Sequence, residues 1–180
     1  VTVARAARTA VFPARFMLVA AMNPCPCGFL GDAVRECRCT PQQIARYRDR
    51  LSGPLRDRLD LTVEVPALPA AVLTTAASGE ASATVRERVV AARDLQGERY
   101  ARHGIRANTE ITPALMTRYC PLDAPAARLL DTAITRMALS ARGYDRVRKV
   151  ARTIADLAGA DGIAADHLAE ALQFRMLEGR

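Results

Sequence analysis

Several residue types are scarce in this chain of 180 residues, and each shortage narrows what the protein can do. Tryptophan is absent, aromatic residues make up 4% of the chain, and Lys149 is the only lysine among 26 basic residues. Chemistry that needs a lysine therefore has a single candidate. No run approaches the roughly 18 apolar residues of a membrane span, and the N-terminus lacks the order of a signal peptide. We expect a cytoplasmic protein with no membrane partner.

Positive charge and apolar residues are plentiful. Half of the chain is hydrophobic, which suffices to build a core for one domain or two small ones. The net charge of +7 favours a polyanionic partner such as DNA, RNA or a nucleotide.

The N-terminal third has the pattern of mixed α/β structure. Two short extended stretches within residues 1–15 predict a hairpin with Arg5 and Arg8 near its tip. The unbroken apolar run 16–22 predicts a central strand, and the strict alternation of 59–65 predicts a half-buried strand.

Helices dominate the remainder. The order Thr40, Pro41, Gln43 is a capping box that should start a helix ending near residue 51. An Ala/Thr/Ser-rich linker is expected at 67–79. Beyond it, the periodicity predicts helices at 80–103, 113–119, 124–139, 141–158 and 164–176. The clearest amphipathic face consists of Val147, Val150, Ala151, Ile154, Leu157 and Ala158.

Four of the five cysteines form two Cys-x-Cys pairs, Cys25 with Cys27 and Cys37 with Cys39. Four thiolates on one loop can close a tetrahedral zinc site, although the usual spacing in such sites is Cys-x-x-Cys. The alternative is four reduced thiols, or an oxidised pair, that bind nothing.

Three polar positions are candidates for contacting a phosphate. Asn23 ends the predicted strand 16–22, where α/β sheets place ligand-binding groups, although it could simply cap the turn before Pro24. Arg58 lies in a short turn with acidic neighbours, so a solvated ion-pair cluster is the alternative there. Arg146 has no acidic residue three or four positions away, which favours either an external anion or a solvated basic face.

Several motifs in this order resemble the magnesium-chelatase-like ATPases of the ComM/YifB family. They are Phe12-Pro-Ala-Arg-Phe, Val19-Ala-Ala-Met-Asn-Pro-Cys-Pro-Cys-Gly, Cys37-Arg-Cys-Thr-Pro, Leu51-Ser-Gly-Pro-Leu, Asp57-Arg-Leu-Asp-Leu and Ala151-Arg-Thr-Ile-Ala-Asp-Leu. The resemblance spans nearly the whole chain and implies the C-terminal part of an AAA+ ATPase, mixed α/β but mostly helical. Residues 1–66 would be the end of the α/β core, 67–107 a linker with a long helix, and 108–180 an all-helical lid.

The resemblance also implies roles for individual residues. Arg5 and Arg8 would contact DNA from a pre-sensor-1 hairpin, and Asn23 would be sensor 1. Arg58 would be the arginine finger that reaches a neighbouring subunit's nucleotide. Arg146 would be sensor 2, with Arg142, Lys149 and Arg152 as competitors.

The function implied is an ATP-driven DNA motor, with ATP and Mg²⁺ as cofactors, a homo-hexameric ring, and single-stranded or branched DNA as partner. The resemblance implies that the motor drives branch migration of DNA during natural transformation. The chain contains no Gly-x-x-x-x-Gly-Lys-Ser/Thr loop, so we expect a fragment that does not hydrolyse ATP alone. The alternatives are a magnesium-chelatase-type ATPase subunit, or a zinc-stabilised nucleic-acid-binding module that needs no ATP.

Overall fold

The computed structural model describes residues 1–5, 8–14, 16–66, 68 and 79–176. They divide into two compact units, Val1–Arg48 and Asp49–Arg180, which are treated separately below. The predicted linker at 67–79 lies almost entirely outside the described residues. Among the helices that are described, none has the length and apolar character needed to cross a membrane.

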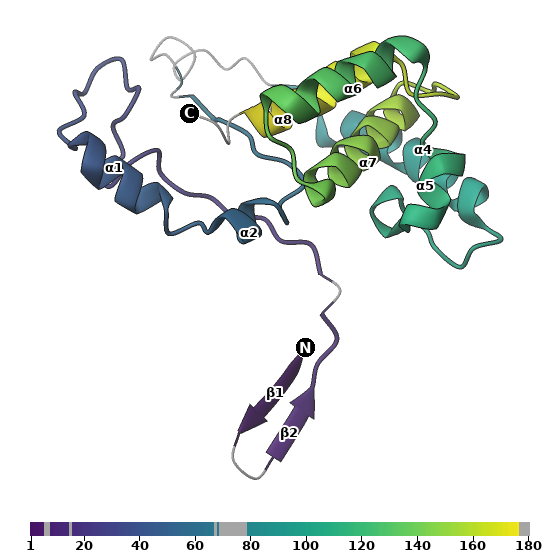
Figure 1. Cartoon of the computed structure of the whole chain (residues 1–180), viewed down its shortest axis with the longest axis horizontal. Helices are drawn as coiled ribbons and strands as arrows, with labels where there is room; N and C mark the ends of the chain where they lie inside the picture. The colour runs from purple at the N-terminus through teal and green to yellow at the C-terminus, as the bar shows by residue number, and fades with distance from the viewer. Residues whose placement is uncertain (6–7, 15, 67, 69–78, 177–180) are drawn as a thin grey trace. The chain divides into compact units, whose positions relative to one another are not determined.

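The first unit begins with the predicted hairpin. Strands β1 (Thr2–Arg5) and β2 (Arg8–Val11) pair antiparallel, with Thr2 opposite Val11 and Arg5 opposite Arg8 (Figure 1). Every residue of both strands is exposed. A two-stranded ribbon exposed on both faces has no core of its own, and such a hairpin is only marginally stable in isolation.

The first unit also contains helix α1 (Pro41–Arg48), which begins at the predicted capping box. The backbone N–H of Gln43 donates to Thr40 Oγ1 at 3.3 Å, and the backbone N–H of Thr40 donates to Gln43 Oε1 at 2.9 Å. Each side chain therefore satisfies a backbone donor that the first turn leaves unpaired. The predicted start is confirmed, and the helix ends three residues before the predicted end.

Both predicted core strands are wrong. Segments 16–22 and 59–65 are irregular, and the apolar side chains of the first lie in solvent, with Met17 88% and Val19 85% exposed. A strand requires a neighbour to pair its backbone N–H and C=O groups. Within the described part of the chain, neither segment lies beside another strand, and the backbone N–H of Thr62 donates instead to the carbonyl of Phe174 in α8.

The second unit starts with the short helix α2 (Gly53–Arg56) and is otherwise a bundle of helices. These are α4 (Ser82–Tyr100), the 3-10 turn η1 (Asn108–Glu110), α5 (Pro113–Tyr119), α6 (Ala124–Arg136), α7 (Ala141–Leu157) and α8 (Ala165–Met176). All five helices predicted beyond the linker are confirmed to within three residues at each end. The mixed, mostly helical fold class is confirmed as well.

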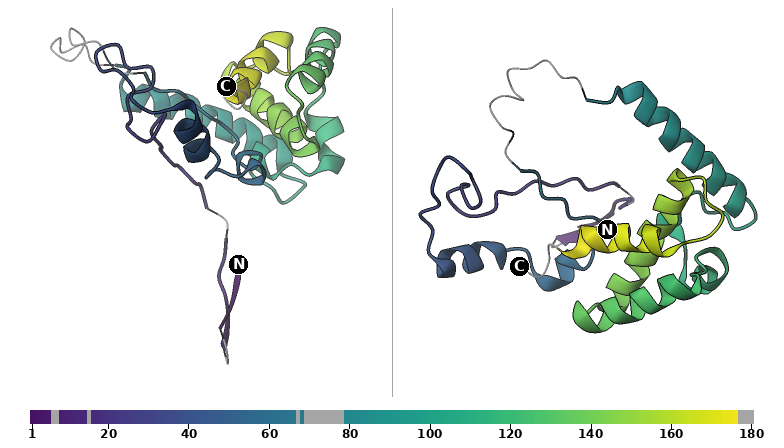
Figure 2. Two further views of the ribbon diagram at one scale, coloured as in Figure 1. Left: turned by 60° about the vertical axis from the view of Figure 1, so that its left-hand side comes forward. Right: turned by 90° about the horizontal axis from the view of Figure 1, so that it is seen from above.

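Helix α7 is the centre of this bundle. It packs against α8, α4 and η1, while α6 covers α8. The long helix α4 meets the bundle through its C-terminal half, where its buried residues Ala92, Gln96 and Tyr100 lie (Figure 2). The largest buried apolar side chains of the core include Leu130, Val147, Ile163 and Leu168.

The buried face of α7 differs from the predicted apolar face at its C-terminal end. Leu157 is 47% exposed, whereas Arg152 and Asp156 are 1% and 3% exposed. The Asp156 carboxylate accepts a hydrogen bond from Arg152 Nε, two from the Arg99 guanidinium and one from Asn108 Nδ2. Buried charges are tolerated when they are paired and fully hydrogen-bonded, which explains why polar residues replace the apolar ones here.

Candidate functional site

The side chains of the four clustered cysteines converge on one point, and all four residues lie in a loop outside the helices and strands. Cys25 Sγ lies 3.4 Å from Cys27 Sγ and 3.7 Å from Cys37 Sγ, and Cys27 Sγ lies 3.6 Å from Cys37 Sγ. All four sulfurs, including that of Cys39, lie within 4.8 Å of one another. Four sulfurs at about 2.3 Å from one zinc ion stand about 3.8 Å apart in a tetrahedron. The cluster therefore fits zinc in donor type and in size.

A tight turn brings the first cysteine pair into this cluster. The backbone N–H of Gly28 donates to the carbonyl of Cys25 at 3.1 Å, which closes a turn around Cys27. Gly28 has φ +84°, a left-handed conformation that glycine adopts without strain. The same turn aims a backbone N–H at the second sulfur, and the hydrogen bond from Phe29 lowers the pKa of Cys27 to about 6. Thiolate is the form that binds metal.

Asn23 lies two residues before this cluster and is exposed. A Cβ placed on Gly28 would lie 3.8 Å from Asn23 Nδ2, so the amide of Asn23 rests against the glycine of the cysteine turn. The structure thus places the sensor 1 candidate next to the candidate metal site.

Arg58 follows α2 and is exposed. Its Nη1 donates to the carbonyl of Pro54 at 3.0 Å, and within the described residues no ion pair involves it. The two nearby carboxylates are engaged elsewhere: Asp60 pairs with Arg146, and Asp57 Oδ1 lies 3.9 Å from Arg175 Nη2. The ion-pair cluster considered from the sequence therefore leaves out Arg58, whose guanidinium faces solvent.

Arg146 does have a carboxylate partner, but one supplied from outside its own helix. Its Nη1 donates to Asp60 Oδ1, 86 positions away in the sequence. The ion pair therefore connects α7, which carries the sensor 2 candidate Arg146, to the segment that contains the arginine finger candidate Arg58. The interpretation of Arg146 as unpaired, drawn from its neighbours on the helix, is wrong because only local partners were considered.

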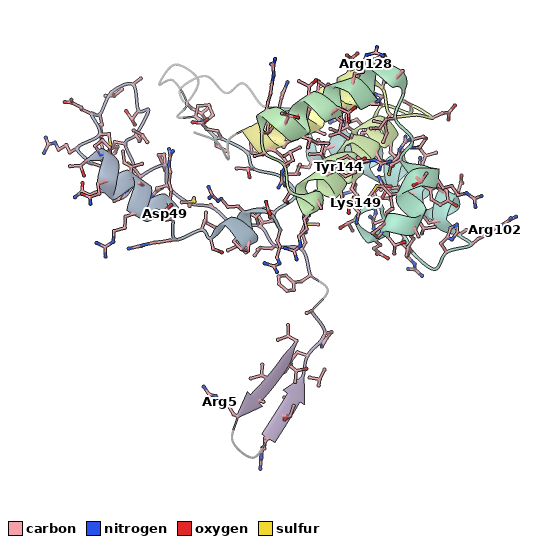
Figure 3. The ribbon with its side chains drawn as sticks, in the orientation of Figure 1. Arg5, Asp49, Arg102, Arg128, Tyr144 and Lys149 are labelled. Atoms are coloured by element: carbon pink, nitrogen blue, oxygen red, sulfur yellow. The ribbon has the colours of Figure 1, made fainter. Side chains whose placement is uncertain are left out.

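The competitors for the sensor 2 role have different surroundings. Arg152 is buried and donates to Asp156 and to the carbonyls of Ala160 and Asp161, so it holds the bundle together. Lys149 Nζ donates to the carbonyl of Thr109 at 3.0 Å, and partial burial lowers the pKa of Lys149. Arg142 is exposed at the start of α7. Figure 3 shows Tyr144 and Lys149 on this helix.

Arg5 and Arg8 face each other across the last pair of the hairpin, and both are exposed. Figure 3 shows Arg5 at the turn end of β1. Two exposed arginines at the end of one ribbon place two positive charges where they are open to an anionic partner.

Sequence reasoning missed Arg175, which is 2% exposed and donates from Nη1 to the carbonyl of Leu59 at 2.8 Å. A signal was present in the sequence. Arg175 continues the apolar series Leu168, Ala171 and Leu172 of α8 at helical spacing. A charged residue in line with a buried stripe needs a partner, and none is acidic within one turn on α8.

The exposed basic hairpin, the four-cysteine loop and the helical unit follow one another along the chain, and two family models match the same two regions. The family model described as magnesium chelatase, subunit ChlI, matches residues 1–73, and the model of the ChlI C-terminal domain matches residues 79–175. The chain belongs to the magnesium chelatase ChlI family.

Three bacterial proteins illustrate the similarity. The competence protein ComM of Haemophilus influenzae is 45% identical over 178 residues, which is 98% of this chain and 34% of that protein. The uncharacterized protein YifB of Escherichia coli is 43% identical over 169 residues, 93% of this chain and 32% of its own length. An uncharacterized protein of Mycobacterium tuberculosis is 41% identical over 180 residues, 100% of this chain and 35% of its own length. The chain spans about a third of the length of these relatives.

Proposed function

We propose that this chain is the C-terminal part of a cytoplasmic, ATP-driven AAA+ motor that acts on single-stranded or branched DNA as a homo-hexameric ring. The observation that carries the proposal is the fully exposed hairpin with Arg5 opposite Arg8 at its end. The relative named as a competence protein supports a role in DNA uptake or recombination. The net charge of +7 agrees with a polyanionic partner.

Three residues would serve the ATPase reaction. Asn23 would orient a water toward the terminal phosphate, and Arg146 would contact the same nucleotide from the helical domain. Arg58 would reach the nucleotide of the next subunit, where a guanidinium stabilises the charge that develops during phosphoryl transfer. The exposure of Arg58 supports this role, since a finger must be free to leave its own subunit. ATP and Mg²⁺ would be bound mainly by a P-loop that this chain does not contain.

The DNA role is tested by the salt dependence of binding. We expect the chain to bind a labelled branched DNA, and the double variant Arg5→Ala/Arg8→Ala to bind it more weakly. Each lost phosphate contact should lower the slope of log K against log salt by about 0.7 to 0.9, so the pair should lower it by about 1.4 to 1.8.

The control is the double variant Arg102→Ala/Arg128→Ala, which removes the same charge from exposed positions of the helical unit. We expect it to leave the slope nearly unchanged. Equal losses in the two double variants would mean that DNA responds to net charge alone, and the hairpin would have no special part.

We also propose that Cys25, Cys27, Cys37 and Cys39 bind one zinc ion. The sulfur separations support this. Zinc with four thiolate ligands has no open position, so its contribution here would be structural. It would fix the turn against which Asn23 rests.

Metal analysis of the chain purified without chelator should give one zinc per chain. Replacing Cys27 with serine should remove most of the metal, because three ligands remain and the site loses its closed geometry. Cys120, which is buried in the core of the helical unit and is not one of the four clustered cysteines, provides the control: Cys120→Ala should keep its zinc. Metal-free wild-type protein would refute the site.

The second candidate function is a subunit of a magnesium-chelatase ATPase, which the family match itself favours. The hairpin experiment distinguishes the two functions. A chelatase subunit does not act on DNA. A full-length protein that hydrolyses ATP but does not bind branched DNA would therefore favour the chelatase function.

A further inference from the structure

Two consecutive residues at the end of α8 hold the segment around Arg58. Arg175 Nη1 donates to the carbonyl of Leu59 at 2.8 Å, and its Nη2 lies 3.9 Å from Asp57 Oδ1. The carbonyl of Phe174 accepts a hydrogen bond from the backbone N–H of Thr62 at 3.0 Å. Arg58 thus lies between the two residues that a single guanidinium contacts.

The guanidinium of Arg175 lies against the first turn of α7. Gly143 in the first turn of α7 faces it, and a Cβ at that position would lie 3.6 Å from Arg175 Nη2. A buried guanidinium is costly unless it is paired and hydrogen-bonded, and an apolar side chain would continue the buried stripe of α8 without that cost. Stability of the bundle alone therefore does not account for an arginine at position 175.

Arg58 itself has little that fixes its direction. Its side chain is exposed, and its described hydrogen bond goes to the carbonyl of Pro54. A catalytic group that is displaced by about 1 Å can lose about a hundredfold in rate. The contacts of Arg175 to the Leu59 carbonyl and the Asp57 carboxylate hold the residues on both sides of Arg58 in place.

We propose that Arg175 is a positioning residue for the arginine finger: it anchors the carbonyl of Leu59 and the carboxylate of Asp57, on the two sides of Arg58, to α8. Movement of this helix is then transmitted directly to Arg58. The proposal deepens the function proposed above and rests on the role of Arg58 in it.

The anchor is tested first without reference to ATP, by amide hydrogen exchange in this chain. Arg175→Met keeps the apolar stem of the side chain and removes its hydrogen bonds. We expect exchange at the Thr62 amide, which donates to the carbonyl of Phe174 next to Arg175, to rise about tenfold in this variant, while the interior of α6 is unchanged. Arg175→Lys should give an intermediate rise, because an ammonium cannot contact Leu59 and Asp57 as a fork does. Unchanged exchange in Arg175→Met would overturn the anchor.

The catalytic consequence is tested in the full-length ring by steady-state ATP hydrolysis. Arg175→Met should lower kcat about tenfold to a hundredfold with KM for ATP nearly unchanged, since the finger acts in the transition state. In an Arg58→Ala background the same change should cause no further loss. Additive losses would show that Arg175 acts on something other than the finger.

Arg128→Ala, an exposed arginine change on α6, is the control and should keep wild-type exchange and turnover. The two arms separate the claims. If exchange is faster in Arg175→Met but the Arg58→Ala enzyme is active, Arg175 is an anchor but Arg58 is not the finger. The positioning role of Arg175 is then rejected as well. If exchange is unchanged in Arg175→Met and the Arg58→Ala enzyme is inactive, Arg58 is the finger but Arg175 does not anchor it.

Discussion

The helical region from α4 to α8 and the irregular segments 16–22 and 59–65 contain similar apolar residues. The helical region buries many of them, whereas the two segments leave most of theirs exposed. Leu130 in α6 is 1% exposed, whereas Leu61 in the second segment is 52% exposed. A helix pairs its backbone groups within itself and needs only one face covered, whereas a strand needs a hydrogen-bonding neighbour. The helices therefore pair their backbone groups internally, whereas segments 16–22 and 59–65 have no strand beside them among the described residues.

The largest effect should come from breaking the polar centre of the helical region. Asp156→Ala leaves Arg152 and Arg99 without their carboxylate, and Arg152 is fully buried. Removing one partner of a buried pair costs about 3–5 kcal/mol. Urea unfolding followed by helical circular dichroism measures it.

The exposed pair Arg88–Glu80 gives the contrast, because its side chains are 55% and 44% exposed. Glu80→Ala should cost about 0–1 kcal/mol in the same measurement. Equal costs for the two carboxylates would mean that the buried network is not what holds α4 to α7.

The next effect compares two leucines directly. Leu130→Ala should destabilise the helical unit by about 2–5 kcal/mol, because it opens a cavity in the core. Leu61→Ala, in the same unit, should change the free energy of unfolding by less than about 0.5 kcal/mol. A large cost at Leu61 would show that segment 59–65 is packed after all, and the contrast between the regions would fail.

The smallest effect concerns α1, which has no buried residue and relies on its capping box. Thr40→Ala should reduce its local stability by about 1 kcal/mol, which amide exchange at Gln43 can detect. Gln42→Ala, next to the box but outside it, should have no such effect.

The sequence predicted the helices well because their signals are local. The spacing in α7 and the box at Thr40 are readable without knowing the rest of the fold. The strands could not be confirmed in the same way, because an apolar run such as 16–22 indicates burial but not what would pair with it. The four cysteines were predicted as a cluster because their pattern lies within 15 residues.

The long-range contacts were beyond local reasoning. Arg146 was interpreted as unpaired because only its helix neighbours were considered, yet its partner Asp60 is 86 positions away. Arg175 was passed over for the same reason, although its place on the buried stripe of α8 indicated a hidden partner.

The central claim is that Arg58 serves as the arginine finger of a ring ATPase, and ATP turnover at saturating nucleotide in the full-length protein tests it most directly. Arg58→Ala should lower turnover by about 10³ to 10⁵ while ATP binding and ring assembly persist. Arg56→Ala, two positions earlier in α2, should retain most of the activity because its side chain points elsewhere. If Arg58→Ala hydrolyses ATP normally and Arg56→Ala does not, the assignment of the finger is wrong.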